Sequence, residues 1–209
     1  MPPSESPADA DIMLRVQAGE LEQFATLIRR YQPALLRVAR SRLGDATWAE
    51  DVVQETFLAV YKARHTYDPR RNFRTWLWTI LINQCHTHGQ RRSRWLRIFS
   101  WPARDEADDV SLAEAPEEPA GEPLTQLLAA ERAALLEELL NQLSAPQADA
   151  LRLRFFGDLK FQEIADTLGC SLLTAKNRVR VGLLRLSQLI AAREVRSLGD
   201  DQRVRPLDR

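Results

Sequence analysis

FQEIADTLGCSLLTAKNRVRVGLLRL, residues 161–186, has the layout of two helices joined by a tight turn. The first helix offers Ile164 for packing and the small Ala165 where a second helix must cross closely. Gly169 provides a backbone that can adopt a positive φ at the turn. Ser171 then occupies an N-cap position, because its hydroxyl can accept a hydrogen bond from an unpaired amide of the next helix. The stretch therefore predicts a helix-turn-helix.

The second helix of this motif combines an apolar stripe with polar donors on its other faces. From residue 172 onward, apolar residues recur at steps of three or four at Ala175, Val179, Leu183 and Leu186. The other faces carry side chains suited to base edges and phosphates of duplex DNA. The candidate contacts are Ser171, Thr174, Lys176, Asn177, Arg178 and Arg180. The alternative is an ordinary helical hairpin with solvated Lys and Arg, which the turn chemistry disfavours.

The rest of the chain also predicts helices, so the fold class is all-α. Apolar residues recur at helical spacing in nearly every periodic segment, and strand-like alternation is missing. The expected helices are 11–18, 20–42, 47–64, 74–96, 124–143, 146–156, 160–168 and 172–195. Pro33 is expected to kink or interrupt the second of these, because it lacks a backbone donor and clashes with the preceding turn.

Charge is segregated along the chain although the total is balanced. Lys plus Arg and Asp plus Glu number 29 each among the 209 residues, so the net charge indicates no particular partner. From Lys62 to Arg97 there are nine basic residues and one acidic residue, whereas from Trp101 to Thr125 there are eight acidic residues and one basic residue. The chain therefore has a basic block followed by an acidic block.

The acidic block predicts a flexible linker between two helical domains. Residues 100–123 carry four prolines and too little apolar surface to offset the entropy of ordering. The expected organisation is a disordered N-terminus at 1–10, a first domain at 11–98, a linker at 99–123, a helix-turn-helix domain at 124–196 and a tail at 197–209.

Cysteine usage and the N-terminus indicate a cytoplasmic protein. Cys85 and Cys170 are far apart without CxxC spacing, which argues against a disulfide framework or a zinc knuckle. The first residues, MPPSESPADAD, lack the basic start and apolar run of a signal peptide. We expect no membrane insertion, no metal and no cofactor. A metal at Cys85, His86 and His88 is disfavoured because adjacent residues of a helix diverge by about 100°.

The segment FRTWLWTILINQCHTHGQRRSRW, residues 73–95, predicts a helix that is apolar around most of its circumference. A narrow polar stripe, which includes Asn83 and His86, occupies the remaining face, and arginines cluster at the end. This pattern favours a helix that packs on most sides and lies against a nucleic acid along the rest. Trp76 and Trp78 belong to the apolar arc, so a supporting role in the core is favoured over direct contact with DNA.

Together these motifs resemble the extracytoplasmic-function sigma factors of bacterial RNA polymerase. The resemblance runs through EDVVQETFLAVYKA and FRTWLWTILINQCHTHGQRR, and again through the helix-turn-helix. It implies a subunit that binds core polymerase, directs it to specific promoters and assists promoter melting, without catalytic residues of its own. It also implies an anti-sigma factor, which members of the family often have, and docking of the C-terminal domain on the polymerase beta flap.

The resemblance assigns roles to individual residues of the first domain. Asp51, Gln54 and Glu55 lie where the family contacts the clamp helices of the largest polymerase subunit, and their spacing places them on one helix face. The loop HTYDPRRNF matches the loop that captures a base flipped from the minus-ten element, with Tyr67, Asn72, Phe73 and Asn83 as the candidate pocket. The full set of minus-ten candidates is Tyr67, Arg70, Arg71, Asn72, Phe73, Arg74, Trp76, Asn83, His86, Arg91 and Arg92. The C-terminal domain is implied to read the minus-thirty-five element.

The linker has a mechanical role in this interpretation. Promoter elements about 17 base pairs apart span about 58 Å, whereas a linker of about 24 residues spans about 27 Å when relaxed and up to about 80 Å when extended. A second hypothesis is that the acidic linker folds over the basic domain and blocks DNA.

Two other functional classes stay open from the residues alone. One is a free-standing helix-turn-helix regulator whose N-terminal domain senses a ligand or dimerises. The other is a small helical nuclease, for which the two histidines of residues 73–95 are the only support and no carboxylate cluster accompanies them.

Overall fold

The computed structural model describes residues 8–99 and 123–201, although the side chains of 90–99, of 194–201 and of part of 123–129 lie outside the description. Every regular element in these ranges is helical, which confirms the all-α prediction. The N-terminal domain comprises α1 (Asp9–Gln17), η1 (Leu21–Gln23), α2 (Phe24–Leu43), α3 (Ala46–Lys62), η2 (Arg64–Thr66) and α4 (Phe73–Phe99). The C-terminal domain comprises α5 (Pro123–Asn141), α6 (Ala145–Phe155), α7 (Phe161–Thr167) and α8 (Leu172–Asp201).

Helix α2 runs through Pro33 without a break, so the expected interruption at this residue is wrong. Pro33 and Arg29, one turn earlier, are both exposed. Water can therefore hydrogen bond to the carbonyl that lacks a donor, and flanking apolar residues such as Leu35 hold the helix in the core. Residues 1–7, 100–122 and 202–209, and with them most of the predicted linker, lie outside the described residues. Helix α1 begins at Asp9, within the N-terminus predicted to be disordered, and α8 continues to Asp201, beyond the predicted end at 195.

The helix-turn-helix forms as its turn chemistry predicts. Gly169 adopts φ 59°, a left-handed conformation that favours glycine. The hydroxyl of Ser171 accepts a hydrogen bond from the backbone N–H of Thr174 at 3.1 Å, which caps α8. Ile164 and Ala165 of α7 are buried. The turn and the cap thus fix the angle at which α8 leaves α7.

One member of the expected apolar stripe of α8 is misplaced. Ala175, Val179 and Leu186 are buried, but Leu183 is 44% exposed. The buried position is Gly182, where an added Cβ would lie 2.9 Å from Cδ1 of Leu151 on α6. The stripe follows the crossing point of α6 and α8, which the spacing of apolar residues alone does not reveal.

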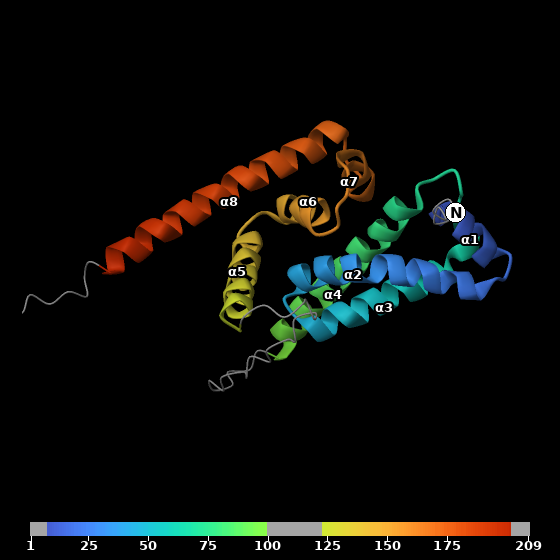
Figure 1. Ribbon diagram of the computed structural model, residues 1–209, viewed down its shortest axis with the longest axis horizontal. Helices are drawn as coiled ribbons and strands as arrows, with labels where there is room; N and C mark the ends of the chain where they lie inside the picture. The colour runs from blue at the N-terminus through green and yellow to red at the C-terminus, as the bar shows by residue number, and fades with distance from the viewer. Residues whose placement is uncertain (1–7, 100–122, 202–209) are drawn as a thin grey trace, which may run out of the picture.

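The two domains contact one another. Helices α6 and α7 lie beside α2 and α4, whereas α8 extends away from the N-terminal domain (Figure 1). Trp78 of α4 is fully buried, and the turn between α6 and α7 packs against it at Gly157. Among the described residues, no helix combines the length and the apolar character that a membrane-spanning segment requires.

Two glycines should respond in opposite ways to the same substitution. Gly169→Ala places a Cβ in a left-handed turn and should lower the free energy of unfolding by about 1 kcal/mol. Gly89→Ala adds a methyl group to an exposed helical position with open space around it and should raise that free energy by about 0.5–1 kcal/mol. Urea unfolding followed by circular dichroism measures both, and a shift of the same sign in both variants would contradict the proposed role of the turn.

Candidate polymerase and nucleic-acid interface

The face of α3 expected to meet polymerase is open to solvent. Asp51 and Gln54 are exposed, and Glu55 is half-buried. Gln54 also lines a groove of about 600 Å³ between α2 and α3, together with apolar side chains that include Phe57 and Leu58. The Glu55 carboxylate lies 2.9 Å from Nε2 of His88 on α4, a contact that sequence reasoning missed. The acidic and amide groups therefore border an apolar groove on the surface of the N-terminal domain.

The aromatic candidates for the minus-ten pocket are packed against each other. Tyr67 is 5% exposed and Phe73 is 3% exposed. Their ring centroids lie 5.8 Å apart, and the ring of Trp76, which is half-buried, lies 5.2 Å from that of Tyr67. The phenol of Tyr67 also donates to the carbonyl oxygen of Arg71 at 2.9 Å. These rings pack together beneath the N-terminal end of α4. A ligand would therefore contact the exposed groups around them first.

The loop before α4 presents polar groups on the surface. Arg70, Arg71 and Asn72 are exposed, as is Asn83 on α4. The side-chain oxygen of Asn72 accepts from the backbone N–H of Thr75 at 3.3 Å and so contributes to the start of α4. The side chains of Arg91 and Arg92 lie outside the described part of the structure. The described loop therefore offers two guanidiniums and an amide beside the buried aromatic cluster.

Two further minus-ten candidates, Arg74 and His86, contact the C-terminal domain. A terminal nitrogen of Arg74 donates to the carbonyl oxygens of Gly157 at 2.7 Å and of Asp158 at 2.6 Å. His86 lies beside Arg42 of α2, with a guanidinium nitrogen 3.1 Å from its Nδ1, and its Nε2 is 3.7 Å from the Asp149 carboxylate. The same guanidinium nitrogen lies 3.3 Å from Nε2, so it faces both ring nitrogens. Burial, followed by the charge of Arg42, lowers the pKa of His86.

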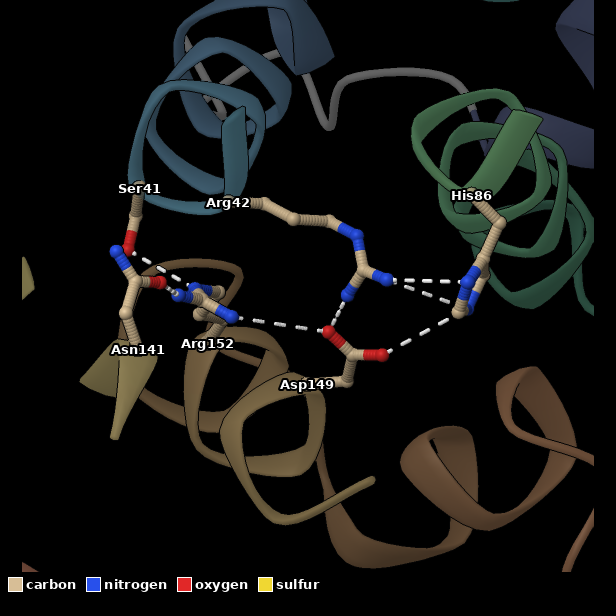
Figure 2. Close-up of polar contacts among 6 residues, drawn as sticks. All are labelled: Ser41, Arg42, His86, Asn141, Asp149 and Arg152. Carbon is tan, nitrogen blue, oxygen red and sulfur yellow. Dashed lines mark hydrogen bonds and ion pairs between the residues drawn. The ribbon is translucent and has the colours of Figure 1, made fainter. Parts of the chain in front are cut away.

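Figure 2 shows the polar contacts around Asp149, which we call the interdomain cluster; it comprises Ser41, Arg42, His86, Asn141, Asp149 and Arg152. Arg42 forms an ion pair with Asp149, whose side chain is 3% exposed. Arg152 donates to Ser41 Oγ at 3.1 Å and to Asn141 Oδ1 at 2.8 Å. Burial lowers the pKa of Arg42, and burial together with the charge of Arg42 lowers the pKa of Arg152 to about 10.

Sequence reasoning missed the interdomain cluster because its partners are distant in the chain. Arg152 and Ser41 are 111 residues apart, and each lies in a helix whose local pattern is ordinary. The available signal is the sequence ALRLRF, in which Arg152 stands between apolar neighbours where a buried face is expected. That signal indicates a buried arginine without indicating its partner.

The candidate contacts for duplex DNA lie along the first turns of α8. Ser171, Lys176, Asn177 and Arg180 are exposed, and Thr174 and Arg178 are half-buried. The hydroxyls of Ser171 and Thr174 lie 2.8 Å apart, so these two residues also hold the start of the helix. Within the described residues, α8 contacts α5, α6 and α7. Its polar face therefore does not meet the N-terminal domain there.

The three side chains considered for a metal diverge in the structure. Cys85 is 1% exposed, His86 lies beside Asp149, and His88 pairs with Glu55. Within residues 8–99 and 123–201, no group of three or more metal-ligating side chains comes together wherever these are described.

Comparison with known proteins decides the family. Residues 27–95 match the model of Sigma-70 region 2, and residues 133–186 match that of Sigma-70 region 4. The RNA polymerase sigma factor CnrH of Cupriavidus metallidurans is 32% identical over 190 residues, which cover 90% of this chain and 97% of the relative. The chain belongs to the ECF sigma factors of RNA polymerase.

Other relatives agree with this assignment. The ECF RNA polymerase sigma-E factor of Escherichia coli is 28% identical, with 84% of this chain and 91% of the relative covered. The structure of CnrH in complex with the cytosolic domain of CnrY gives a TM-score of 0.65 at 26% identity, covering 89% of this chain and 99% of that one. The sigma factor RpoE of Bartonella quintana, in complex with the anti-sigma factor NepR, gives a TM-score of 0.62 at 25% identity and covers 81% and 98%.

The family establishes the activity. This ECF sigma factor directs RNA polymerase to promoters, is not an enzyme, and has core polymerase and promoter DNA as its partners. The two matched regions fall in the two helical domains, and the second contains the helix-turn-helix. The regulator and nuclease alternatives are therefore excluded.

The two cysteines should differ in reactivity. Burial raises the pKa of Cys85 to about 11, whereas Cys170 is partly accessible at the helix-turn-helix. At pH 8 only about one Cys85 thiol in a thousand is ionised, and the thiolate is the reactive form. Iodoacetamide should alkylate Cys170 at least tenfold faster than Cys85, as measured by mass spectrometry of timed samples. Equal rates would show that Cys85 is not buried in solution.

Proposed function

We propose that this sigma factor binds the clamp helices of the largest polymerase subunit through α3 and reads a two-part promoter with α4 and α8. The observation that supports this division is the exposure of the polar groups on α3 and α8 at the positions that match the family motif. The finer domain limits, 11–98 and 124–196, belong to the same proposal, as does a cytoplasmic location. Run-off transcription with core enzyme on a genomic promoter library tests the proposal and reveals the promoter sequence.

The α3 face suits a basic partner. Asp51, Gln54 and Glu55 share one side of the helix, and the groove beside Gln54 offers apolar surface for a helix of the partner. Charged residues at the rim of an interface steer association, while the apolar groove provides area to bury. The combination favours α3 as the polymerase-binding surface of the N-terminal domain.

Reversing one charge on this face should weaken assembly with polymerase. Asp51→Lys replaces an exposed acid with a base opposite a basic partner, so the Kd for core enzyme should rise at least about tenfold, or about 1.4 kcal/mol. Fluorescence anisotropy of the labelled sigma factor measures the Kd. The matched control is Glu22→Lys, which makes the same change at an exposed acid of η1. Equal losses in both variants would point to net charge alone and remove α3 from the proposal.

The start of α8 supports recognition of the minus-thirty-five element in a major groove. Asn177 is exposed and can make a bidentate contact with adenine, whereas Lys176 and Arg180 are suited to phosphates or guanine. Phosphate contacts position the protein and base contacts specify the sequence. We therefore expect most of these side chains to contribute to affinity and only those that contact base edges, such as Asn177, to contribute to specificity.

Removal of one amide should relax specificity at one position. Asn177→Ala should cost about 1–3 kcal/mol on the preferred minus-thirty-five sequence and should level the preference at a single base pair. Selection from a randomised minus-thirty-five library, followed by run-off transcription, measures the change. Gln188→Ala, at an exposed position further along α8, serves as the control and should leave the preference unchanged. An equal loss of affinity for all sequences would show that Asn177 contacts the DNA phosphate backbone and not a base.

For the minus-ten element, the exposed Arg70, Arg71, Asn72 and Asn83 are the proposed first contacts, with Arg74, His86, Arg91 and Arg92 along the same helix. The aromatic cluster of the buried Tyr67 and Phe73 and the half-buried Trp76 supports a flipped base once the surrounding loop moves aside. Promoter melting is part of this proposal.

An anti-sigma factor and the polymerase beta flap are further proposed partners. The anti-sigma factor is proposed because the similar RpoE is solved in complex with the anti-sigma factor NepR. Autoinhibition by the linker stays a separate hypothesis, which neutralising its eight acidic residues would test.

A further inference from the structure

A leucine stands in the middle of the polar face at the start of α8. Leu173 is 77% exposed, more than any other apolar side chain between residues 172 and 190 of this helix. The buried side of α8 carries Ala175 and Gly182, which pack against the rest of the C-terminal domain. Because successive residues of a helix turn by about 100°, Leu173 lies on the opposite side from both. Its side chain therefore points away from the core.

Three polar side chains accompany Leu173 on this face. Lys176, Asn177 and Arg180 follow it by three, four and seven residues, so they lie on the same side of the helix. All three are exposed, and all three are proposed contacts for duplex DNA. They donate hydrogen bonds to base edges and phosphates, whereas a leucine has no polar group to offer. Leu173 can therefore contribute to this face only by covering an apolar group of the ligand.

The surroundings of Leu173 do not form a protein-docking patch. Protein interfaces centre on contiguous apolar surface. The next exposed apolar side chain on the same face of α8 is Leu184, which lies eleven residues, or about 16 Å, further along the helix. The side chains between the two on this face are Lys176, Asn177 and Arg180. An apolar partner for Leu173 must therefore be small and lie among polar groups.

The major groove of duplex DNA presents such a group. Thymine carries its C5 methyl group there beside the O4 acceptor, and apolar side chains of recognition helices contact this methyl. The residues that reach base edges are those near the N-terminus of the recognition helix. Leu173 lies in the first turn of α8, which is held by hydrogen bonds between Ser171 and Thr174. The helix start therefore presents Leu173 where a base edge would lie.

We propose that Leu173 reads a thymine of the minus-thirty-five element through its C5 methyl group and so determines specificity beside the polar contacts of α8. The contact removes from water an apolar side chain that the free protein exposes, and this burial stabilises the complex. A helix rises about 1.5 Å per residue and base pairs lie about 3.4 Å apart, so the thymine is about two base pairs from the pair that Asn177 reads. The inference rests on the proposed major-groove role of α8.

Exchange of thymine for uracil tests the contact, because the two bases pair identically and differ only in the C5 methyl group. The probe is a labelled synthetic promoter duplex that carries the minus-thirty-five sequence selected from the randomised library, with each thymine of that element replaced in turn by uracil. The full-length sigma factor with core enzyme should bind about fourfold more weakly after one of these replacements. Leu173→Ala should bind the thymine duplex about fourfold more weakly than the wild type and lose nothing further at that replacement. Fluorescence anisotropy of the duplex measures each Kd.

Leu184→Ala is the matched control for the truncation. It removes the same atoms from a leucine that is 60% exposed on the same face of α8 but about 16 Å from Leu173. This variant should keep the affinity of the wild type and its sensitivity to uracil. A second duplex restores the methyl on another base: at the sensitive position, 5-methylcytosine should bind the wild type more tightly than cytosine does, and Leu173→Ala should not distinguish them. Circular dichroism of the free variants should show an unchanged helical signal.

Three results would overturn the inference. One is a selected element in which no uracil replacement affects the wild type, and another is a uracil effect that persists in Leu173→Ala. The third is an equal loss by Leu173→Ala on every duplex, which would place this side chain against polymerase or a phosphate. Asn177→Ala judges the proposed function separately: a changed base preference in that variant keeps α8 as the reading helix even if uracil has no effect. If no minus-thirty-five sequence is selected at all, the role of α8 and the role of Leu173 are both wrong.

Discussion

Helix α4 packs into the core of the N-terminal domain, contacts the C-terminal domain and carries proposed DNA contacts. The rest of the structure depends on how these three roles share the surface of one helix. Leu77, Trp78 and Leu81 are fully buried and join the helix to the core. The remaining arc carries Arg74 and His86, which contact the C-terminal domain and are among the proposed DNA contacts. One helix face can be covered by one partner at a time. The relative position of the two domains therefore decides whether Arg74 is available to another partner.

Ion pairs and hydrogen bonds form part of the contact between the two domains. A large apolar interface would hold the domains together, whereas boundaries within a chain that are small and polar allow relative motion. Here the fully buried indole of Trp78 meets a glycine-containing turn, while Arg42, Asp149 and Arg152 supply polar contacts elsewhere on the boundary. The two guanidiniums could exchange the carboxylate for water or phosphate, whereas Asp149 could exchange them only for water or another cation. Specificity of this contact thus comes from charge matching, and the net stabilisation stays modest.

Sequence reasoning succeeded where local chemistry determines the outcome. The helical periods, the positive φ of Gly169 and the N-cap at Ser171 depend on residues within one or two turns of each other. It failed where the outcome depends on a distant element. The exposure of Leu183 follows from the point at which α6 crosses α8, and the burial of Arg152 follows from Ser41 in the other domain. The roles of single residues in DNA contact were inferred from the family pattern, and burial of Tyr67 and Phe73 sets them apart from their exposed neighbours.

If the two domains separate, the hydrogen bonds that Arg74 donates to backbone carbonyl oxygens can be replaced by hydrogen bonds to other acceptors. The proposed two-part promoter, with elements about 17 base pairs and so about 58 Å apart, would require the domains to separate. When Arg74 leaves the carbonyl oxygens of Gly157 and Asp158, a phosphate can accept the same donors through stronger, charge-assisted bonds. Arg74 would thus lose little by changing partners. Separation of the domains would also expose the contact of Trp78 with the turn at Gly157, so polar and apolar contacts together set its cost.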